Sequence, residues 1–246
     1  MASRQRKRHV QLEMPRLDKN GQRRGGKRAG AGRPPKGPRS SAPHTRRAEL
    51  KPAYPQHVTL RVARGVRWLR GWKAFAAIRR ALAVSIDTHA DFRICQFSLQ
   101  GDHLHLLCEA ADRLALARGV QGFEISAARQ LNRALGRRGG TIFPDRYHVE
   151  PIRTVAHVRH ALSYVLNNWR KHRQDREIRG LYEGRLDPFS SAVWFAGFRE
   201  RTQAIAIPPD YEPPRVAAAQ SWLLREGWKR ARPISVYAVP GGGEEP

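Results

Sequence analysis

One hairpin, predicted over residues 92–110, constrains the fold of this chain more than any other segment. Two stretches rich in apolar residues, 92–99 and 103–110, flank the dipeptide Gly101-Asp102. A two-residue loop that begins with glycine is typical of a type II′ turn, which joins adjacent antiparallel strands. The segment is therefore expected to form the two neighbouring strands around which a sheet is built.

The register of this hairpin sorts its side chains onto two faces, because successive residues of a strand point to opposite sides. Pairing across the turn places His103 and His105 on a polar face with Gln96, Ser98 and Gln100. The other face is apolar, and Cys95 is expected to lie there opposite Cys108 as a small core residue. A shift of one residue would mix the two faces, so the pattern favours this register.

His103 and His105 are thus predicted to lie side by side on one strand. Imidazole is the commonest side-chain ligand for metals, so such a pair supplies part of a divalent-metal site. The alternative is a pair of half-exposed strand histidines with no ligand. A further ligand and a nucleophile elsewhere in the chain would favour the metal site.

The periodicity of the remaining chain predicts an α+β fold. Extended stretches are expected at 57–63, 92–99, 103–110 and 141–152, and helices at 71–89, 113–135 and 154–172. The order β-α-β-β-α-β-α is typical of a ferredoxin-like (RRM-like) antiparallel sheet with packed helices. The two histidines then belong to a central strand of that sheet.

Composition changes along the chain and predicts three parts. Residues 1–53 are rich in Arg, Lys, Gly and Pro and form a disordered basic arm; residues 54–200 form the folded domain; residues 201–246 are a proline-rich linker and a short basic helix over 221–232. The net charge is +25, and both the arm and the remainder are basic. Such a charge indicates a polyanionic partner, most simply nucleic acid, although a generally basic protein without that partner is the alternative.

The arm contains an extended Gly-Arg-Pro core between basic residues. This segment, with Arg28, Arg33 and Lys36, resembles the AT-hook, which lays an arginine along the narrow minor groove of A·T-rich DNA. Ala31 stands where an arginine usually precedes the core glycine. An unspecific polycationic linker is an equally open interpretation, and in either case the arm should bind phosphate.

Cysteine content and hydropathy exclude several classes of protein. The chain has two cysteines, which leaves no disulfide framework and no cysteine-type zinc module. No apolar run reaches the roughly 18 residues of a membrane span, and no signal peptide is recognisable. A cytoplasmic protein is therefore expected.

The last predicted helix carries a candidate nucleophile and a candidate ligand. Tyr164 and Asn168 are four residues apart and therefore share a helical face. A phenol beside a divalent cation can attack a phosphate that the cation polarises, and Asn168 has the length to complete a His-His-amide site. Tyr147 is the competing nucleophile, but it lacks an amide four residues later. Three further histidines are interpreted as surface or DNA-contacting residues, namely His148, His157 and His160.

The motif His-hydrophobe-His on a strand, followed by Tyr-x-x-x-Asn on a helix, resembles the single-tyrosine HUH transposases of insertion sequences, and most closely their REP-associated branch. The resemblance covers roughly residues 54–200. It implies that His103, His105 and Asn168 hold Mg²⁺ or Mn²⁺ and that Tyr164 is the nucleophile. The chain departs from the branch after Asn168, where Trp169-Arg170 replaces the usual Pro-Val.

By that resemblance, the chain is a single-strand DNA endonuclease and strand transferase that forms a 5′-phosphotyrosine intermediate in DNA transposition. Its partners would be single-stranded DNA carrying a hairpin and, through the arm, A·T-rich duplex; a homodimer and a bacterial, nucleoid-associated location are compatible with it. The basic residues expected to contact phosphate are Arg146, Arg153, Arg159, Arg170 and Lys171. A catalytically silent DNA- or RNA-binding regulator is the alternative, and a metal-dependent RNA-processing enzyme is a third.

Overall fold

The structure, a computed structural model, describes residues 49–66, 68–174, 186–200, 211–212 and 214–241. All of them belong to one compact unit, His44–Pro246. The predicted basic arm, with its AT-hook-like residues Arg28, Arg33 and Lys36, lies outside the described residues apart from its last few positions. Most of the predicted proline-rich linker is outside them as well.

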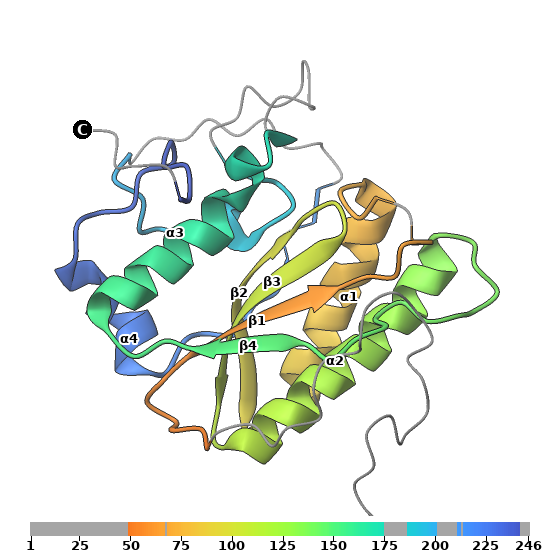
Figure 1. The fold of residues 1–246 in the computed structure, drawn as a ribbon, viewed down its shortest axis with the longest axis horizontal. Coiled ribbons are helices and arrows are strands. Elements are labelled where there is room, and N and C mark those ends of the chain that lie inside the picture. The colour runs from red at the N-terminus through yellow and green to blue at the C-terminus, as the bar shows by residue number, and fades with distance from the viewer. Residues whose placement is uncertain (1–48, 67, 175–185, 201–210, 213, 242–246) are drawn as a thin grey trace, which may run out of the picture. The chain divides into compact units, whose positions relative to one another are not determined.

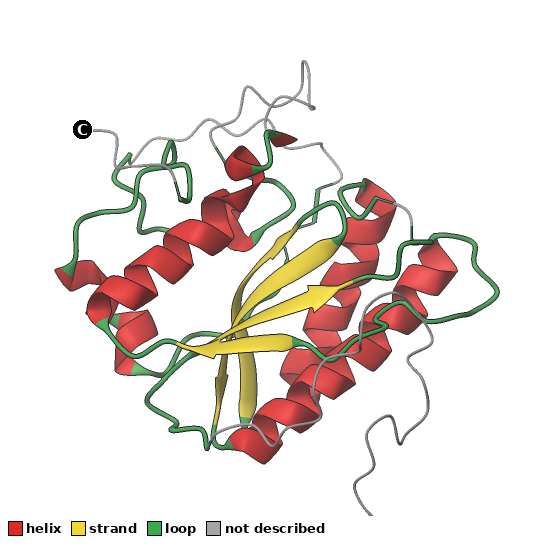
Figure 2. Cartoon of the chain, in the orientation of Figure 1, coloured by secondary structure: helices red, strands yellow, loops and turns green. Residues whose placement is uncertain are grey.

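A four-stranded antiparallel sheet forms the centre of the unit (Figures 1 and 2). Its order is β2-β3-β1-β4, with β1 over Gln56–Arg61, β2 over Phe92–Leu99, β3 over His103–Ala110 and β4 over His148–Pro151. Helices α1 (Trp72–Thr88) and α2 (Arg113–Ala134) cover one face, and α3 (Val155–Lys171) covers the other. This arrangement confirms the predicted α+β, ferredoxin-like fold.

Two apolar clusters hold these layers together. On the α1 and α2 side, Val58 and Leu60 of β1 and Leu104 and Leu106 of β3 are fully or almost fully buried. On the α3 side, the buried stripe of that helix packs on Leu107 of β3. The alternate residues of β1, His57, Thr59 and Arg61, are polar. They point toward α3 and therefore lie on the same face of the sheet as the predicted polar side of the hairpin.

The register of the hairpin is as predicted near its turn and different at its far end. Ser98 pairs with His105, which confirms that His103 and His105 share the α3-facing side. The predicted pairing of Cys95 with Cys108 is wrong, because a β-bulge at Cys95 leaves Ile94 opposite Cys108. Ile94 and Cys108 join the α1/α2 cluster and Cys95 joins the α3 cluster, so the two thiols lie on opposite faces.

The hairpin turn also differs from its prediction. A type II′ turn requires a positive φ at its first central residue, but the φ of Gly101 lies outside the left-handed region. Glycine is needed here for another reason: a Cβ at Gly101 would overlap the indole ring of Trp68. The sequence contains no signal for this contact, because Trp68 belongs to the loop between β1 and α1.

Extended structure before α3 is shorter than predicted, since only His148–Pro151 pairs with β1. Helix α3 begins as predicted after Thr154, whose Oγ1 accepts a hydrogen bond from the His157 N–H at 3.1 Å. That cap satisfies one of the amide groups left free at a helix start. Within the described residues, no helix combines the length and apolarity that crossing a bilayer requires.

The predicted helix over 221–232 is interrupted. It consists of α4 (Trp222–Arg225) and the 3₁₀ turn η3 (Gly227–Arg230), with Glu226 between them in a non-helical conformation. The sequence does not decide whether this segment docks on the domain or on DNA. In the structure, Leu223, Leu224, Ile234 and Val236 belong to the α3-side cluster, and the buried carboxylate of Glu109 accepts hydrogen bonds from the backbone N–H groups of Gln220 and Ser221 at 2.8 Å.

Candidate active site

The two strand histidines form the centre of the candidate site. The Nε2 atoms of His103 and His105 lie 3.0 Å apart on the face of β3 that α3 crosses. His105 is only 4% exposed, whereas His103 lies at the mouth of the site with its side chain 17% exposed. Two imidazole nitrogens that point at one another are disposed to share a ligand.

Each imidazole is held by groups behind it. The Asp102 carboxylate contacts Nδ1 of His103 at 2.7 Å. Nδ1 of His105 lies 3.1 Å from Nε2 of His57 and 3.2 Å from the hydroxyl of Thr59. A partner on one ring nitrogen fixes the tautomer and orientation of a ligating histidine. In both rings, the nitrogen left for a ligand is Nε2.

Burial keeps the inner histidines neutral. It lowers the pKa of His105 to about 2 and that of His57 to about 4, and the neighbouring imidazoles add to both effects. At the mouth, the hydrogen bond from His103 lowers the pKa of the Asp102 carboxyl, so that this group is ionised. A metal binds the neutral imidazole, and the inner ring is therefore in its ligating form.

Tyr164 projects from α3 toward this pair. Its ring lies edge-on to that of His105, with centroids 5.0 Å apart, and 5.6 Å from that of His57. The Lys171 ammonium lies 5.3 Å from the centre of the same ring. The phenol is half-buried, and one chain thus brings the candidate nucleophile and the histidine pair together.

Asn168 lies between two α3 side chains that contact the histidine pair. Tyr164, one turn before it, touches His105, and His172, one turn after it, has its ring 5.7 Å from that of His103. The Asn168 side chain is fully buried, and neither Oδ1 nor Nδ2 has a hydrogen-bond partner among the described residues. Buried polar groups are usually hydrogen-bonded, so both polar atoms of this amide are available to a water molecule or a ligand.

These observations test whether the residues fit a divalent cation. Two imidazoles and an unsatisfied amide oxygen suit Mn²⁺ by donor type, and Mg²⁺ less well because it prefers oxygen ligands. Groups of three or more His, Cys, Asp or Glu that could hold a metal do not occur in the described part of the chain. The predicted set contains only two such residues, since its third member is an amide.

Of the five basic residues predicted to contact phosphate, three are exposed and two are hydrogen-bonded to the C-terminal segment. Arg146 and Arg153 are exposed, and Lys171 is exposed beside Tyr164. Two arginines are engaged by the C-terminal segment: Arg159 donates from Nε to the Arg232 carbonyl at 2.8 Å, and Arg170 donates to that of Val236 at 2.8 Å. These two guanidinium groups therefore have a structural partner within the chain, and DNA contact by any of the five stays a prediction.

Of the alternative residues, His148 and His157 lie near enough to His57 to help lower its pKa. Tyr147 packs against the α1/α2 cluster, on the side of the sheet away from the histidine pair. His148 and His160 are exposed, and His157 lies 3.5 Å from the Glu150 carboxylate.

Sequence reasoning missed four residues of the site, namely His57, Thr59, Asp102 and His172. The first two lie on β1, and the pairing of Thr59 with His105 is a contact between distant segments. The alternation of His57, Thr59 and Arg61 was the available signal, because it predicts a common face. Asp102 was considered only as a turn residue, although it adjoins His103.

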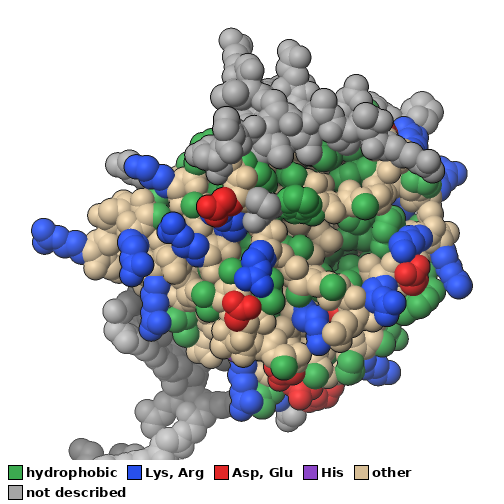
Figure 3. Space-filling view, turned by 180° about the vertical axis from the view of Figure 1, so that it is seen from behind, with side chains coloured by type: hydrophobic (Ala, Val, Ile, Leu, Met, Phe, Trp, Pro, Cys, Tyr) green, Lys and Arg blue, Asp and Glu red, His purple; other side chains and the backbone are tan. Residues whose placement is uncertain are grey.

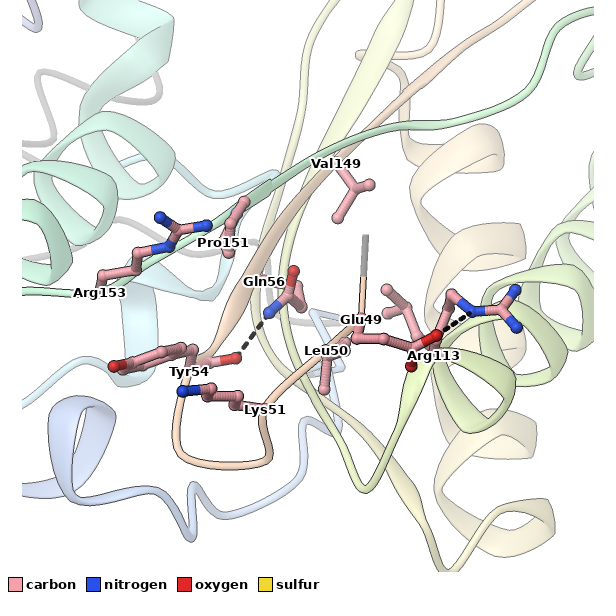
Figure 4. Close-up of a pocket in the computed structure, with 10 residues that line it drawn as sticks. Glu49, Leu50, Lys51, Tyr54, Gln56, Arg113, Val149, Pro151 and Arg153 are labelled. Carbon is pink, nitrogen blue, oxygen red and sulfur yellow. Dashed lines mark hydrogen bonds and ion pairs between the residues drawn. The ribbon is translucent and has the colours of Figure 1, made fainter. Parts of the chain in front are cut away.

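A cavity of about 460 Å³ lies on the other side of the sheet and does not include the histidine pair. It opens between the start of β1, the end of β4 and the start of α2. Figure 4 shows Tyr54, Lys51 and Arg153 along one side, and Glu49 close to Arg113 on the other. Lys and Arg side chains are spread over the surface that Figure 3 shows.

A comparison with known protein families gives a match over residues that contain most of the candidate site. Residues 55–168 match the model of the IS200-like transposase family, and this range contains the histidine pair, Tyr164 and Asn168. Residues 55–168 are therefore similar to IS200-like transposases. This match confirms, over these residues, the resemblance that the sequence predicted.

Two solved structures are similar to parts of this chain. A REP-associated tyrosine transposase bound to a REP hairpin is 17% identical, with 72% of this chain and 100% of that chain covered and a TM-score of 0.49. A candidate transposase from Deinococcus radiodurans R1 is also 17% identical, with 45% of this chain and 84% of that chain covered and a TM-score of 0.32. No curated protein matches the chain.

Proposed function

We propose that this chain is a metal-dependent single-strand DNA endonuclease and strand transferase that acts in DNA transposition. The observation that carries the proposal is the meeting of three features in one chain. They are the tyrosine ring 5.0 Å from His105, the paired Nε2 atoms of the two histidines, and the buried Asn168 amide without a partner. The proposed site needs no second chain, so a homodimer is not a requirement of the proposal.

In this proposal, His103, His105 and Asn168 hold Mg²⁺ or Mn²⁺, which supplies charge stabilisation to the scissile phosphate. The Tyr164 oxygen attacks phosphorus, the bond from phosphorus to the 3′-oxygen breaks, and the phenol proton is released to solvent. The products are a free 3′-hydroxyl, after its oxygen takes up a proton, and a 5′-phosphotyrosine. Attack by another 3′-hydroxyl reverses these changes and joins the strands.

Other chain residues support these steps. Asp102, His57 and Thr59 orient the two imidazoles, and the Lys171 ammonium beside the Tyr164 ring favours negative charge on the attacking oxygen. The exposed Arg and Lys side chains would contact the DNA backbone. The REP-associated transposase compared above is bound to a REP hairpin, so we propose a hairpin with a single-stranded flank as the substrate, met at the bacterial nucleoid.

The test is covalent trapping. Labelled single-stranded DNA with its hairpin, incubated with the protein and Mn²⁺, should yield a denaturant-resistant adduct that Tyr164→Phe abolishes and Tyr147→Phe retains. An adduct that persists in Tyr164→Phe would remove Tyr164 from this role. DNA binding without an adduct under either metal would favour a silent regulator, and RNA cleavage independent of Tyr164 would favour the RNA-processing alternative.

A further inference from the structure

An exposed tryptophan lies against the hairpin turn that precedes His103. Trp68 belongs to the loop between β1 and α1 and is 51% exposed. The benzenoid part of its ring lies against Gly101 in the turn of the β2–β3 hairpin, where a Cβ would overlap it. The neighbouring Leu69 is fully buried and donates its N–H to the Gly101 carbonyl at 3.0 Å, which holds the loop against the turn.

This contact brings the indole to Gly101, which is two residues before His103 in the sequence. Gly101 adjoins Asp102, whose carboxylate holds His103 at 2.7 Å. Three other tryptophans among the described residues are exposed, namely Trp72, Trp222 and Trp194, the last residue of the 3₁₀ turn Ser191–Trp194. Trp72 packs on Phe75, Phe189 and Tyr211, and Trp222 follows Ser221, which is hydrogen-bonded to Glu109 at the far end of β3. The Trp68 ring lies against Gly101, which leaves room for it because it has no side chain.

A cation flanks His103 from the adjacent strand. Arg61 is the last residue of β1, it pairs directly with His103 on β3, and it is exposed. Alternation along β1 gives Arg61 the same face as His57 and Thr59, which is the face of the histidine pair. Arg61 therefore lies beside His103 on the neighbouring strand, and Trp68 lies against the turn that precedes His103.

We propose that Trp68 stacks on an unpaired base of the strand next to the scissile phosphate and that Arg61 contacts the backbone phosphate beside that base. The inference rests on the proposed function, because it takes single-stranded DNA as the ligand. Aromatic side chains stack on any base, since every base has a π-face, and a nearby cation tracks the backbone. Together the two residues would direct the strand across His103 toward Tyr164.

The experiment measures binding without cleavage, in full-length protein that carries Tyr164→Phe. Hairpin oligonucleotides are made with 2-aminopurine at one position of the single-stranded flank at a time. We expect quenching at one position, lost in Trp68→Ala and largely retained in Trp68→Phe, and an affinity roughly 5- to 100-fold weaker in Trp68→Ala. The matched control is Trp222→Ala, because Trp222 is 48% exposed and lies at the other end of β3.

Salt dependence separates the two roles. Arg61→Gln should lower the magnitude of the slope of log affinity against log salt by about 0.7, the value for one phosphate contact on a single strand. Trp68→Ala should weaken binding and leave that slope unchanged. Thermal unfolding of each variant checks that the protein is folded. If Trp68→Ala does not fold, Trp68→Leu serves in its place, because leucine keeps an apolar side chain but has no π-face to stack on a base.

Several outcomes would overturn the proposal: equal quenching and affinity in Trp68→Ala and in the parent protein, a similar loss in Trp222→Ala, or an unchanged salt slope in Arg61→Gln. These results are distinguishable from failure of the proposed function. Adduct formation by Tyr164 in otherwise unaltered protein, without any effect of Trp68, rejects only the stacking site. Stacking without any adduct supports this binding site and rejects the catalytic proposal.

Discussion

At the scale of single residues, the candidate site depends on side chains that hold other side chains. Nδ1 of His105 has two neighbours on β1, the His57 ring and the Thr59 hydroxyl, and Nδ1 of His103 has the Asp102 carboxylate. These partners prevent the rings from rotating and leave Nε2 of each free to bind a ligand. Partners of this kind commonly change metal affinity when they are removed.

Removal of the His57 ring should weaken metal binding without removing a ligand. His57→Ala is expected to lower the affinity for Mn²⁺ by about 10- to 100-fold, because the His105 ring loses its support. Titration calorimetry or the EPR signal of free Mn²⁺ measures this change directly. His160→Ala, on the exposed side of α3, is the control, and equal affinities in the two variants would contradict the positioning role.

Neutral buried histidines make stability depend on pH. Burial holds the pKa of His105 at about 2 and that of His57 at about 4, whereas both titrate near 6.5 in the unfolded chain. Between pH 6.5 and about pH 4, the unfolded state binds more protons, so stability falls as the pH falls. Each histidine should account for about 2 kcal/mol of lost unfolding free energy between pH 7 and pH 5.

Urea unfolding with a chelator present measures this effect. His57→Gln should reduce the difference in unfolding free energy between pH 7 and pH 5 by about 2 kcal/mol. Carboxylates that titrate in the same range contribute equally to both proteins and cancel. An identical difference in wild type and variant would show that His57 is not held neutral by burial.

At the scale of elements, a buried ion pair connects the hairpin to two other segments. Arg70 donates to the Leu99 carbonyl at 2.7 Å and to both carboxylate oxygens of Asp187 at 2.8 and 3.0 Å. Its guanidinium also lies over the rings of Phe189 and of Trp169, the residue after Asn168. Arg70 thus ties the end of β2, the segment that begins at Asp187, and the C-terminal part of α3 to one another.

Loss of one partner should destabilise this connection strongly. Asp187→Ala leaves the Arg70 charge buried, and we expect a loss of about 3–5 kcal/mol in unfolding free energy. The exposed pair Lys229–Glu226 is the control, where Glu226→Ala should cost less than about 1 kcal/mol. Replacement of both buried partners, Arg70→Met with Asp187→Leu, should recover much of the loss. A small effect of Asp187→Ala on urea unfolding would be inconsistent with this account.

At the scale of the whole molecule, the C-terminal segment is part of the folded unit. Ile234 and Val236 are fully buried in the α3-side cluster. Around them, the Glu200 carboxylate accepts hydrogen bonds from the Val236 N–H at 2.9 Å and the Ser235 hydroxyl at 2.8 Å. Asn167, beside Asn168, donates to the Ser235 carbonyl at 2.9 Å. The C-terminal segment therefore supports the helix that carries Tyr164.

A substitution that creates a cavity in this cluster should lower the unfolding free energy of the whole unit. Ile234→Ala removes buried methyl and methylene groups, and the expected loss is about 2–5 kcal/mol, with a lower melting temperature. Val239→Ala, in the same segment but with Val239 49% exposed, should change unfolding free energy by less than about 0.5 kcal/mol. Equal melting temperatures for the two variants would mean that the segment is not docked in solution.

Features that depend on near neighbours in the chain were predictable. Alternation along residues 103–105 places two histidines on one face, and helical spacing places Tyr164 and Asn168 on another. The cap at Thr154 has its own local signal. These patterns are encoded by the 2.0 and 3.6 residue periods of strand and helix, which require no knowledge of the rest of the molecule.

Other features arise from contacts between distant segments, for which the sequence has no local signal. The bulge at Cys95 brings Ile94 to the α1/α2 face opposite Cys108 and leaves Cys95 buried on the α3 side. His57 and Thr59 reach His105 only because β1 pairs with β3, and Trp68 meets Gly101 only because a loop folds over the hairpin turn. Local periodicity thus specifies which face a side chain occupies, whereas its partner on that face is specified by packing of the whole chain.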